Sequence, residues 1–199
     1  MPERFPGYDV LAKWDTLSWN NVTRRVISER LAIRDEPRFF TAEAFVTLQA
    51  VADRVVPQPL HRRKIPVAGL IDDKLMRDQQ DGYRAPGMPP QREGWRRGLR
   101  ALNAEAGAGF QRLGAEGQDA LLARMERGDL HHPAWEGMPP AIFWKQRMLR
   151  DIVLAYWSHP TAWNEIGWGG PASPRGYVRL GYDERDPWEA KQRRDFGAG

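Results

Sequence analysis

Apolar residues recur every three or four positions through most of the chain, which is the spacing of helices that bury one face. No segment alternates apolar and polar residues for long enough to indicate a strand, and no internal repeat is visible. A chain of 199 residues can bury an adequate core in one domain. The pattern therefore predicts an all-α fold with about six helices in a compact single-domain bundle.

Three helices are expected in the first half. The first runs from a Ser18 cap to about Ala32. Its partial apolar stripe comprises Trp19, Val22, Val26 and Leu31. The second runs from a Thr41 cap to about Val56, where VVPQP ends it, and its apolar positions are Phe45, Leu48, Ala52, Val55 and Val56. The third begins at Pro66, with one face made by Leu70, Ile71 and Leu75, and the turn-rich DGYRAPGMPP then separates two halves of the domain.

Three further helices follow. The fourth opens at Pro90, ends at the glycines 107 and 109, and carries the stripe Trp95, Leu99, Leu102 and Ala106. The fifth spans Gln118 to Arg127 and stops at Gly128. The sixth starts at Pro140 and is expected to be the central buried helix, because little polar surface remains among Ile142, Phe143, Leu149, Ile152, Val153 and Tyr156.

The two ends of the chain are expected to be irregular. Residues 1–17 form an N-terminal arm, residues 18–158 the helical core, and residues 159–199 a Gly/Pro/Trp-rich C-terminal tail. The tail opens with HPTAWNEIGWGGPASPRGYVRL, where Pro removes backbone donors and Gly costs conformational entropy. We expect this run to fix an irregular path that displays Trp168, Tyr177 and Arg179 as a shaped contact surface.

Composition excludes several redox and metal roles. These residues contain no Cys, so they offer no disulfide, thiolate zinc site, iron-sulfur cluster or covalently attached haem. The net charge is +4, with 30 bases interleaved among 26 acids, which favours a charge-mixed surface over a nucleic-acid footprint. We therefore expect no nucleic-acid partner.

The sequence also indicates the cellular location that we expect for the protein. MPERFPGYDV has no apolar signal core, Arg24 and Arg25 precede a polar VISERLAI, and no run approaches the roughly 18 apolar residues of a membrane span. The expected protein has no membrane span and no export signal of its own, and the expected location is the cytoplasm.

Residues with catalytic potential form no recognisable motif. GWGGPAS resembles a phosphate loop but lacks the strand before it and the helix after it. His131 and His132 are expected to be solvated or to cap, and the acidic pairs Asp72-Asp73 and Glu184 with Asp186 are expected on polar surfaces. No serine lies in a nucleophile elbow. We predict no catalytic, cofactor-binding or metal-binding residue in this chain.

Aromatic residues outside the helical stripes are the unusual feature. The chain has nine Trp, and Trp14, Trp163, Trp168 and Trp188 fall in segments expected to be irregular. These rings can fold back onto the chain's own helices or lie against another protein, because Trp, Tyr and Arg dominate interface hot spots. Both alternatives stay open and can hold for different rings.

Two segments carry a resemblance to a known family. FFTAEAFVTLQAVADRVVPQP and PPAIFWKQRMLRDIVLAYWSHPTAWNEIGWGGPASPRGY resemble the gluconate 2-dehydrogenase subunit 3 family over about residues 38–180. The most specific part is the run W-x-E-I-G-[aromatic]-x-G-P-A-x-P-x-G-Y. The resemblance implies a small, non-catalytic subunit that binds, stabilises and helps to mature a large FAD-dependent flavoprotein of the glucose-methanol-choline type, which oxidises sugars, polyols or sugar acids.

The same resemblance implies further partners and a division of labour. A multihaem cytochrome c subunit often joins such complexes, FAD belongs to the large chain, and this chain is implied to hold no cofactor. Many members begin with a twin-arginine signal that is not found here. Export to the periplasm with a partner that carries the signal is therefore the alternative to the cytoplasm.

The candidate partner interface combines the aromatic residues with the motif. It comprises Trp14, Trp163, Glu165, Trp168, Gly169, Gly170, Pro171, Tyr177, Arg179 and Trp188. The alternative function is a self-sufficient helical enzyme or sugar-binding protein that acts on a small carbohydrate. Its Trp rings would form a stacking platform, and its acid-base candidates are Asp151, His159 and Glu165.

Overall fold

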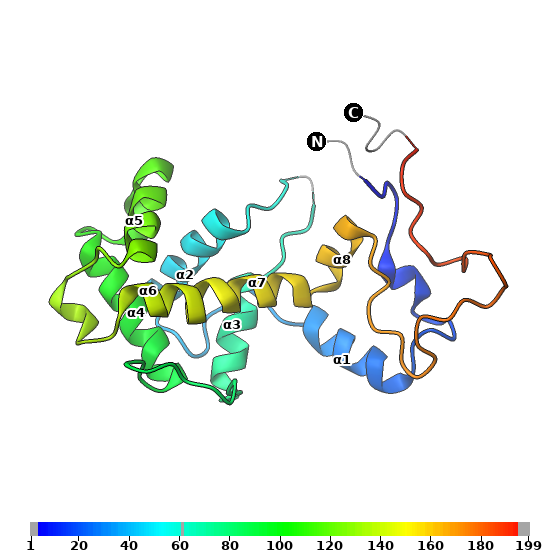
Figure 1. The fold of residues 1–199 in the computed structure, drawn as a ribbon, viewed down its shortest axis with the longest axis horizontal. Helices are drawn as coiled ribbons and strands as arrows, with labels where there is room; N and C mark the ends of the chain where they lie inside the picture. The colour runs from blue at the N-terminus through cyan, green and yellow to red at the C-terminus, as the bar shows by residue number, and fades with distance from the viewer. Residues whose placement is uncertain (1–3, 61, 195–199) are drawn as a thin grey trace. The chain divides into compact units, whose positions relative to one another are not determined.

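Helices account for all the regular structure in residues 4–60 and 62–194, which the computed structural model describes (Figure 1). The all-α prediction is confirmed. Contacts within the chain gather in two compact units: a terminal unit of residues 1–32 and 157–199, and a central unit of residues 33–156. The first predicted helix thus belongs with the arm and the tail rather than with the helical core, and the DGYRAPGMPP loop lies inside the central unit.

The central unit holds most of the helices. They are α2 (Ala42–Val55), α3 (Val67–Met76), α4 (Gln91–Glu105), η2 (Phe110–Arg112), α5 (Ala115–Arg127), η3 (Pro133–Trp135), α6 (Pro140–Phe143), η4 (Trp144–Met148) and α7 (Leu149–Ser158), whose last turn crosses the unit boundary. Helix α2 contacts α3, α4 and α5, and α4 contacts η3 and α6. This core sits around the stripe predicted for the fourth helix, since Trp95, Leu99 and Leu102 are fully buried.

Aromatic packing closes the centre of this unit. The Trp95 ring lies edge-on to Phe143 at 5.7 Å and to Phe40 at 6.0 Å between centroids. Gly98 lets α4 approach α6 closely, because a Cβ atom there would lie 2.2 Å from the Phe143 ring. A glycine inside α4, unfavourable for an isolated helix, is therefore explained by packing.

The predicted sixth helix is continuous but not uniform. Its middle, Trp144–Met148, is a π-helical segment between α6 and α7. The extra residue in this turn changes the phase of the buried face. Phe143, Ile152 and Tyr156 are buried as expected, whereas Ile142, Leu149 and Val153 are only half-buried. Met148 and Arg147 take buried positions that the apolar pattern did not identify.

The prediction that Asp72 and Asp73 lie on a polar surface is wrong. Asp72 is fully buried, and its carboxylate accepts hydrogen bonds from the backbone N–H groups of Arg38, Phe39 and Phe40 at 2.9 to 3.1 Å. Asp73 pairs with Arg38 at 3.0 Å and is 9% exposed. The segment before α2 needs an acceptor because its N–H groups have no helical partner.

A second buried carboxylate, Asp151, anchors a charged cluster. It accepts a hydrogen bond from the Trp95 indole at 3.0 Å and lies 3.4 Å from the Lys74 ammonium. Asp81 pairs with both Lys74 and Arg147. Burial raises the pKa of Asp151, and the two cations oppose that shift. This cluster ties the polar side of α3 to α7 inside the central unit.

Most helix ends follow the predicted signals. Thr41 caps α2 by accepting the Ala44 N–H, Pro90 precedes α4, and Gly128 ends α5 in the left-handed conformation. Helix α5 begins at Ala115, one turn before the predicted Gln118. Residues upstream of 118 carry no side-chain cap that would have indicated this start.

The terminal unit is built from η1 (Val10–Lys13), α1 (Asn21–Leu31) and α8 (Pro160–Ile166). Its core comprises Val10, Trp19, Ile27 and Trp163. The arm and the tail run side by side (Figure 1): the Arg193 N–H donates to the Arg4 carbonyl at 3.0 Å, and the Val10 N–H donates to Asn164 at 2.8 Å. A backbone hydrogen bond also joins Asn20 to Ser173 at 3.1 Å.

The predicted cap and the predicted buried face of α1 are wrong. The cap of α1 is Asn20, whose side chain accepts the Thr23 N–H, and not Ser18. The helix therefore begins later, Val22 and Val26 face solvent at 58% and 42% exposure, and the buried positions are Thr23 and Ile27.

The start of the tail, predicted to be irregular, is helical. Pro160 occupies the first position of α8, where its missing N–H costs nothing, and the His159 ring accepts the Thr161 N–H. Across residues 4–60 and 62–194, no helix combines the length and the apolar character needed to cross a membrane.

Candidate functional site

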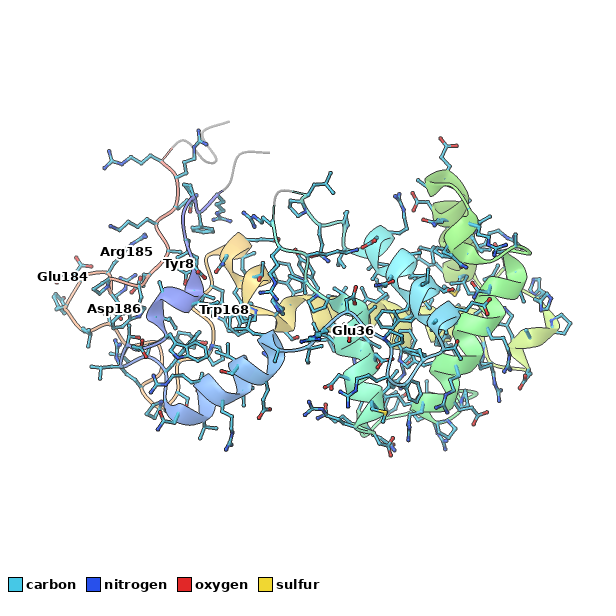
Figure 2. The ribbon with its side chains drawn as sticks, turned by 180° about the vertical axis from the view of Figure 1, so that it is seen from behind. Tyr8, Glu36, Trp168, Glu184, Arg185 and Asp186 are labelled. Carbon is cyan, nitrogen blue, oxygen red and sulfur yellow. The ribbon has the colours of Figure 1, made fainter. Side chains whose placement is uncertain are left out.

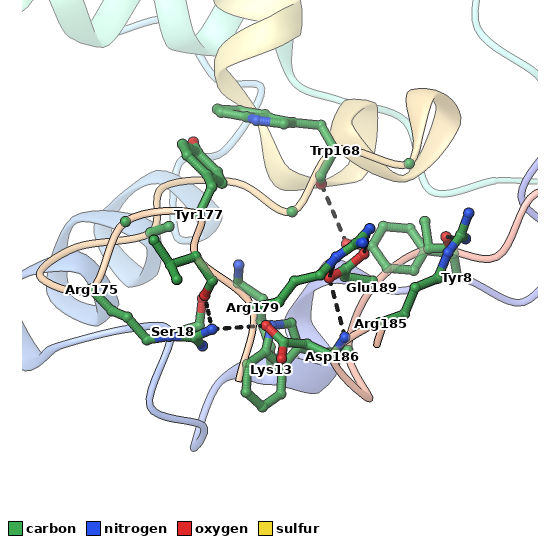
Figure 3. Close-up of a pocket in the computed structure, with 17 residues that line it drawn as sticks. Tyr8, Lys13, Ser18, Trp168, Arg175, Tyr177, Arg179, Arg185, Asp186 and Glu189 are labelled. Atoms are coloured by element: carbon green, nitrogen blue, oxygen red, sulfur yellow. Dashed lines mark hydrogen bonds and ion pairs between the residues drawn. The ribbon is translucent and has the colours of Figure 1, made fainter. Parts of the chain in front are cut away.

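A pocket of about 350 Å³ lies in the terminal unit, between the arm and the tail (Figure 3). The arm contributes Tyr8, Lys13 and Ser18, and the tail contributes residues between Gly167 and Ala190. Volumes of a few hundred Å³ suit a small ligand or an inserted side chain. The walls combine aromatic rings with a dense set of charges.

Ion pairs within the tail shape one side of the pocket. Arg179 binds Glu189 through two hydrogen bonds of 2.8 and 2.9 Å, and Arg175 pairs with Asp186 at 3.0 Å (Figure 3). The hydrogen bonds from Arg179 lower the pKa of Glu189. Asp186 is buried and also accepts the Leu180 N–H at 2.8 Å, so the expectation of a polar surface holds for exposed Glu184 but not for Asp186.

Aromatic rings pack against these charges. The Arg175 guanidinium lies 5.6 Å from the centroid of the Trp188 ring, which is half-buried. The Tyr8 hydroxyl donates to the Trp168 carbonyl at 3.4 Å (Figures 2 and 3). Burial, followed by the charges of Asp9 and Glu189, raises the pKa of Tyr8 to about 12. Tyr8 is therefore a neutral hydrogen-bonding group at physiological pH.

Lys13 is the unusual charge in this pocket. The residue is 2% exposed, and its ammonium lies 5.2 Å from the centroid of the Trp19 ring. Within residues 4–60 and 62–194, no carboxylate or other acceptor pairs with this ammonium. Burial first and the Arg175 charge second lower the pKa of Lys13 to about 8.

Several predicted interface residues serve the unit's own core. Trp163 is 2% exposed, and its indole donates to the Trp157 carbonyl at 2.6 Å. Trp14 is half-buried and lies edge-on to Trp19 at 5.7 Å. Gly170 is buried with φ of +67°, and a Cβ atom there would lie 2.8 Å from the Trp163 ring. The motif glycine is thus required by both its backbone conformation and its close packing.

Other predicted interface residues face solvent. Trp168 is 38% exposed and lies edge-on to Trp163 at 4.8 Å. Tyr177 is 70% exposed, although its hydroxyl donates to the Gly170 carbonyl at 3.1 Å. Gly169 lines the same pocket, Pro171 is half-buried beside it, and Glu165 is half-buried on α8. The structure therefore brings all of the predicted interface residues into one unit but divides them between core and surface.

Sequence reasoning missed an apolar segment directly after the motif. Val178, Leu180 and Tyr182 are 72%, 58% and 100% exposed. Together with Tyr177 they form what we call the apolar rim, Tyr177 to Tyr182. The signal was present as YVRLGY, in which large apolar residues alternate with polar or small ones in a stretch expected to be irregular. The buried Lys13 carried no sequence signal.

The acid-base candidates of the alternative function have local structural roles. Asp151 belongs to the charged cluster of the central unit, and the His159 ring caps α8. His132 likewise accepts the Ala134 N–H at 3.1 Å, which confirms the capping interpretation for that residue. In the described part of the chain, no three His, Cys, Asp or Glu residues gather in a group that could hold a metal ion.

Comparison with known proteins gives one match. The sequence model of the family described as gluconate 2-dehydrogenase subunit 3 matches residues 42–170, which is more than half of the chain. Comparisons with curated proteins and with solved structures gave no match. The matched range includes most of the central unit and the first part of the tail, through Gly170.

Proposed function

The chain belongs to the gluconate 2-dehydrogenase subunit 3 family, and we propose that it is the non-catalytic small subunit of a dehydrogenase complex. The proposed partner is a large FAD-dependent flavoprotein of the glucose-methanol-choline type that oxidises sugars, polyols or sugar acids. The proposed role of this chain is to bind that flavoprotein, stabilise it and help it to mature. In this proposal FAD resides in the partner.

The family match over residues 42–170 is the observation that carries the proposal. The terminal unit supports it with a surface suited to a protein partner. Trp168 and the apolar rim expose large apolar side chains within one stretch of the tail, whereas scattered single apolar residues would need no explanation. Aromatic residues with adjacent arginines are typical of interface hot spots.

Truncating an exposed aromatic should separate binding from folding. We expect Trp168→Ala and Tyr182→Ser each to weaken assembly with the flavoprotein by about 2 kcal/mol, roughly 30-fold in affinity. Tyr182 is 100% exposed, so its replacement should leave the melting temperature of the isolated chain unchanged. Each variant is co-expressed with the flavin-dependent dehydrogenase encoded beside it, and the flavin-loaded complex is quantified by pull-down.

Val46→Ala provides the matched control, because Val46 is 45% exposed on α2 in the central unit. It should leave recovery of the complex unchanged. Full recovery of the complex with both tail variants would remove the tail from the interface. If only the Trp168 variant melted early as an isolated chain, its ring would be assigned to packing against Trp163. Recovery of the complex with the Tyr182 variant would then show whether the tail belongs to the interface.

The isolated chain should neither oxidise sugars nor hold flavin. The proposal places the reaction and the FAD in the partner, so an assay with sugars and an artificial electron acceptor should give no rate above buffer. Purified chain should show no flavin absorption after gel filtration. A turnover that survives purification would instead support the self-sufficient enzyme, and a retained flavin band would contradict the proposed division of labour.

A further inference from the structure

Lys13 is a buried cation that pairs with no carboxylate in residues 4–60 and 62–194. The residue is 2% exposed, and the centroid of the Trp19 ring lies 5.2 Å from the charge, while no hydrogen-bond acceptor or carboxylate among the described residues pairs with it. A buried charge is costly unless it is paired, and buried Lys is almost always paired. The side chain lines the pocket between the arm and the tail, so a ligand in that pocket can reach it (Figure 3).

The rest of the pocket leaves the positive charge unbalanced. Its lining contains four cations, Lys13, Arg175, Arg179 and Arg185, and two carboxylates, Asp186 and Glu189. Both carboxylates are already engaged, Asp186 by Arg175 and Glu189 by Arg179. Arg185 donates to the Ala190 carbonyl at 3.1 Å. The pocket therefore has an excess positive charge, which favours an anionic group.

Apolar surface surrounds this charge. Trp168 lines the pocket at 38% exposure, and Tyr177 and Val178 of the apolar rim line it at 70% and 72%. Leu180 and Tyr182 extend the exposed apolar surface beyond the lining. An apolar surround excludes water and strengthens an ion pair at its centre, the arrangement found at protein-protein hot spots.

We propose that this pocket receives an Asp or Glu carboxylate, or the C-terminal carboxylate, of the flavoprotein partner, with Lys13 as its counter-ion and the apolar rim packed around it. The inference rests on the proposed function and adds the chemistry of the contact. A polypeptide fits better than a free organic acid because Leu180 and Tyr182 lie outside the pocket, where a small ligand would leave them exposed. The charge and the apolar rim together match an acidic side chain in an apolar surface.

The Lys13 charge should lower the stability of the free chain and raise the affinity of the chain for the flavoprotein. In the free chain its pKa of about 8 lies below the ordinary value of 10.5, so the unfolded chain binds the proton more tightly. The resulting destabilisation is fully present below pH 8 and disappears as pH rises toward 10.5. Lys13→Met should therefore raise the melting temperature of the free chain at pH 7, by an amount that shrinks above pH 8.

In the complex, Lys13→Met should be unfavourable, because it should weaken binding to the flavoprotein. Lys13→Met would leave the partner carboxylate buried and unpaired, so we expect at least a tenfold loss of affinity at pH 7. Wild-type affinity should fall as pH rises above about 8, because the free chain then loses the proton that the pair needs. The variant should lack this dependence, because methionine carries no ammonium that could lose a proton as pH rises. The charged or titratable groups that line the pocket with Lys13 are retained in the variant: Tyr8, Arg175, Tyr177, Arg179, Arg185, Asp186 and Glu189.

A zero-length carbodiimide cross-link identifies the contact directly. The reagent joins an amine to a carboxylate that it touches, so the complex with the co-expressed flavoprotein should yield a peptide in which Lys13 is bonded to a partner carboxylate. Lys64→Met is the matched control, because the Lys64 ammonium is exposed and already paired with Asp53 at 2.7 Å. That variant should leave affinity and its pH dependence unchanged.

The outcomes separate this inference from the proposed function. A wild-type complex that tolerates Lys13→Met with unchanged affinity, and gives no Lys13 cross-link, would overturn the inference and leave the subunit role intact. Failure of the wild-type chain to assemble would overturn both. Sodium acetate or sodium gluconate that raises the melting temperature of the free wild-type chain but not of Lys13→Met, while the variant still assembles fully, would assign the pocket to a small acid instead.

Discussion

Replacing Trp95 by Ala should lower the free energy of unfolding of the central unit by about 3 to 5 kcal/mol. The indole is fully buried between Phe40 and Phe143, so truncation removes a large apolar surface and leaves a cavity. It also removes the donor to Asp151, a residue that is only 2% exposed. Since small domains are stable by roughly 5 to 15 kcal/mol, this change is expected to bring the unit close to unfolding.

Two controls test the reason for that loss. Trp95→Phe keeps most of the ring volume but not the hydrogen bond to Asp151, and should cost less than the Ala variant. Arg96→Ala removes the neighbouring guanidinium, which lies 4.1 Å from the Phe39 ring centroid in an exposed position, and should cost less than about 1 kcal/mol. Urea unfolding followed by circular dichroism measures all three. Similar midpoints for the Ala variants of Trp95 and Arg96 would contradict the assignment of the core.

The sequence predicted best those features that depend on local chemistry. Thr41 accepts the Ala44 N–H and Gly128 adopts a left-handed backbone, and each effect operates within one helical turn. The stripe Trp95, Leu99, Leu102 was correct because a regular helix keeps its phase over that length. The phase failed beyond the π-helical turn at Trp144–Met148, where Leu149 is half-buried, since periodicity assumes an uninterrupted helix.

Long-range contacts explain the features that the pattern could not predict. Pro160 and the glycines near it indicated a coil, yet the His159 cap, the position of Pro160 and burial of Trp163 allow α8 to form. In α1, Val22 and Val26 matched an apolar stripe, but Ile27 meets the core made by Val10 and Trp163. Which face of a helix is buried depends on the elements packed against that helix as much as on the spacing of its own apolar residues.

The candidate site likewise combines features that the sequence could identify with features that depend on tertiary contacts. Composition identified the tail aromatics, and the family motif includes Gly170, which packs against the Trp163 ring. Neither could reveal which rings are buried, because Trp163 and Trp168 occupy the same short run and differ only in their tertiary environment. Lys13 could not be identified from the sequence, because its importance lies in having no carboxylate partner among the residues that the structure describes, and only a spatial arrangement can show that.

The second large effect is expected at Asp72, a residue that the sequence placed on the surface. Its carboxylate accepts the N–H groups of Arg38, Phe39 and Phe40 just before α2, so one side chain orients the entry to that helix. Asp72→Ala would leave these donors without their acceptor, two of them on buried residues, at about 1 to 3 kcal/mol for each unsatisfied group. We expect a total loss of at least about 3 kcal/mol.

Comparison with the neighbouring aspartate makes this prediction specific. Asp73→Ala removes ion pairs to Arg38 and Arg77, whose side chains are 59% and 49% exposed, and exposed partners contribute about 0 to 1 kcal/mol. Asp72→Asn keeps the size but turns an NH₂ group toward backbone donors, so it should resemble the Ala variant rather than the wild type. Urea midpoints of the three variants decide between the roles. If Asp72→Asn unfolded with the wild-type midpoint, the backbone N–H groups before α2 would not depend on that carboxylate, and the helix entry would have to be held by the packing of Phe39 and Phe40 alone.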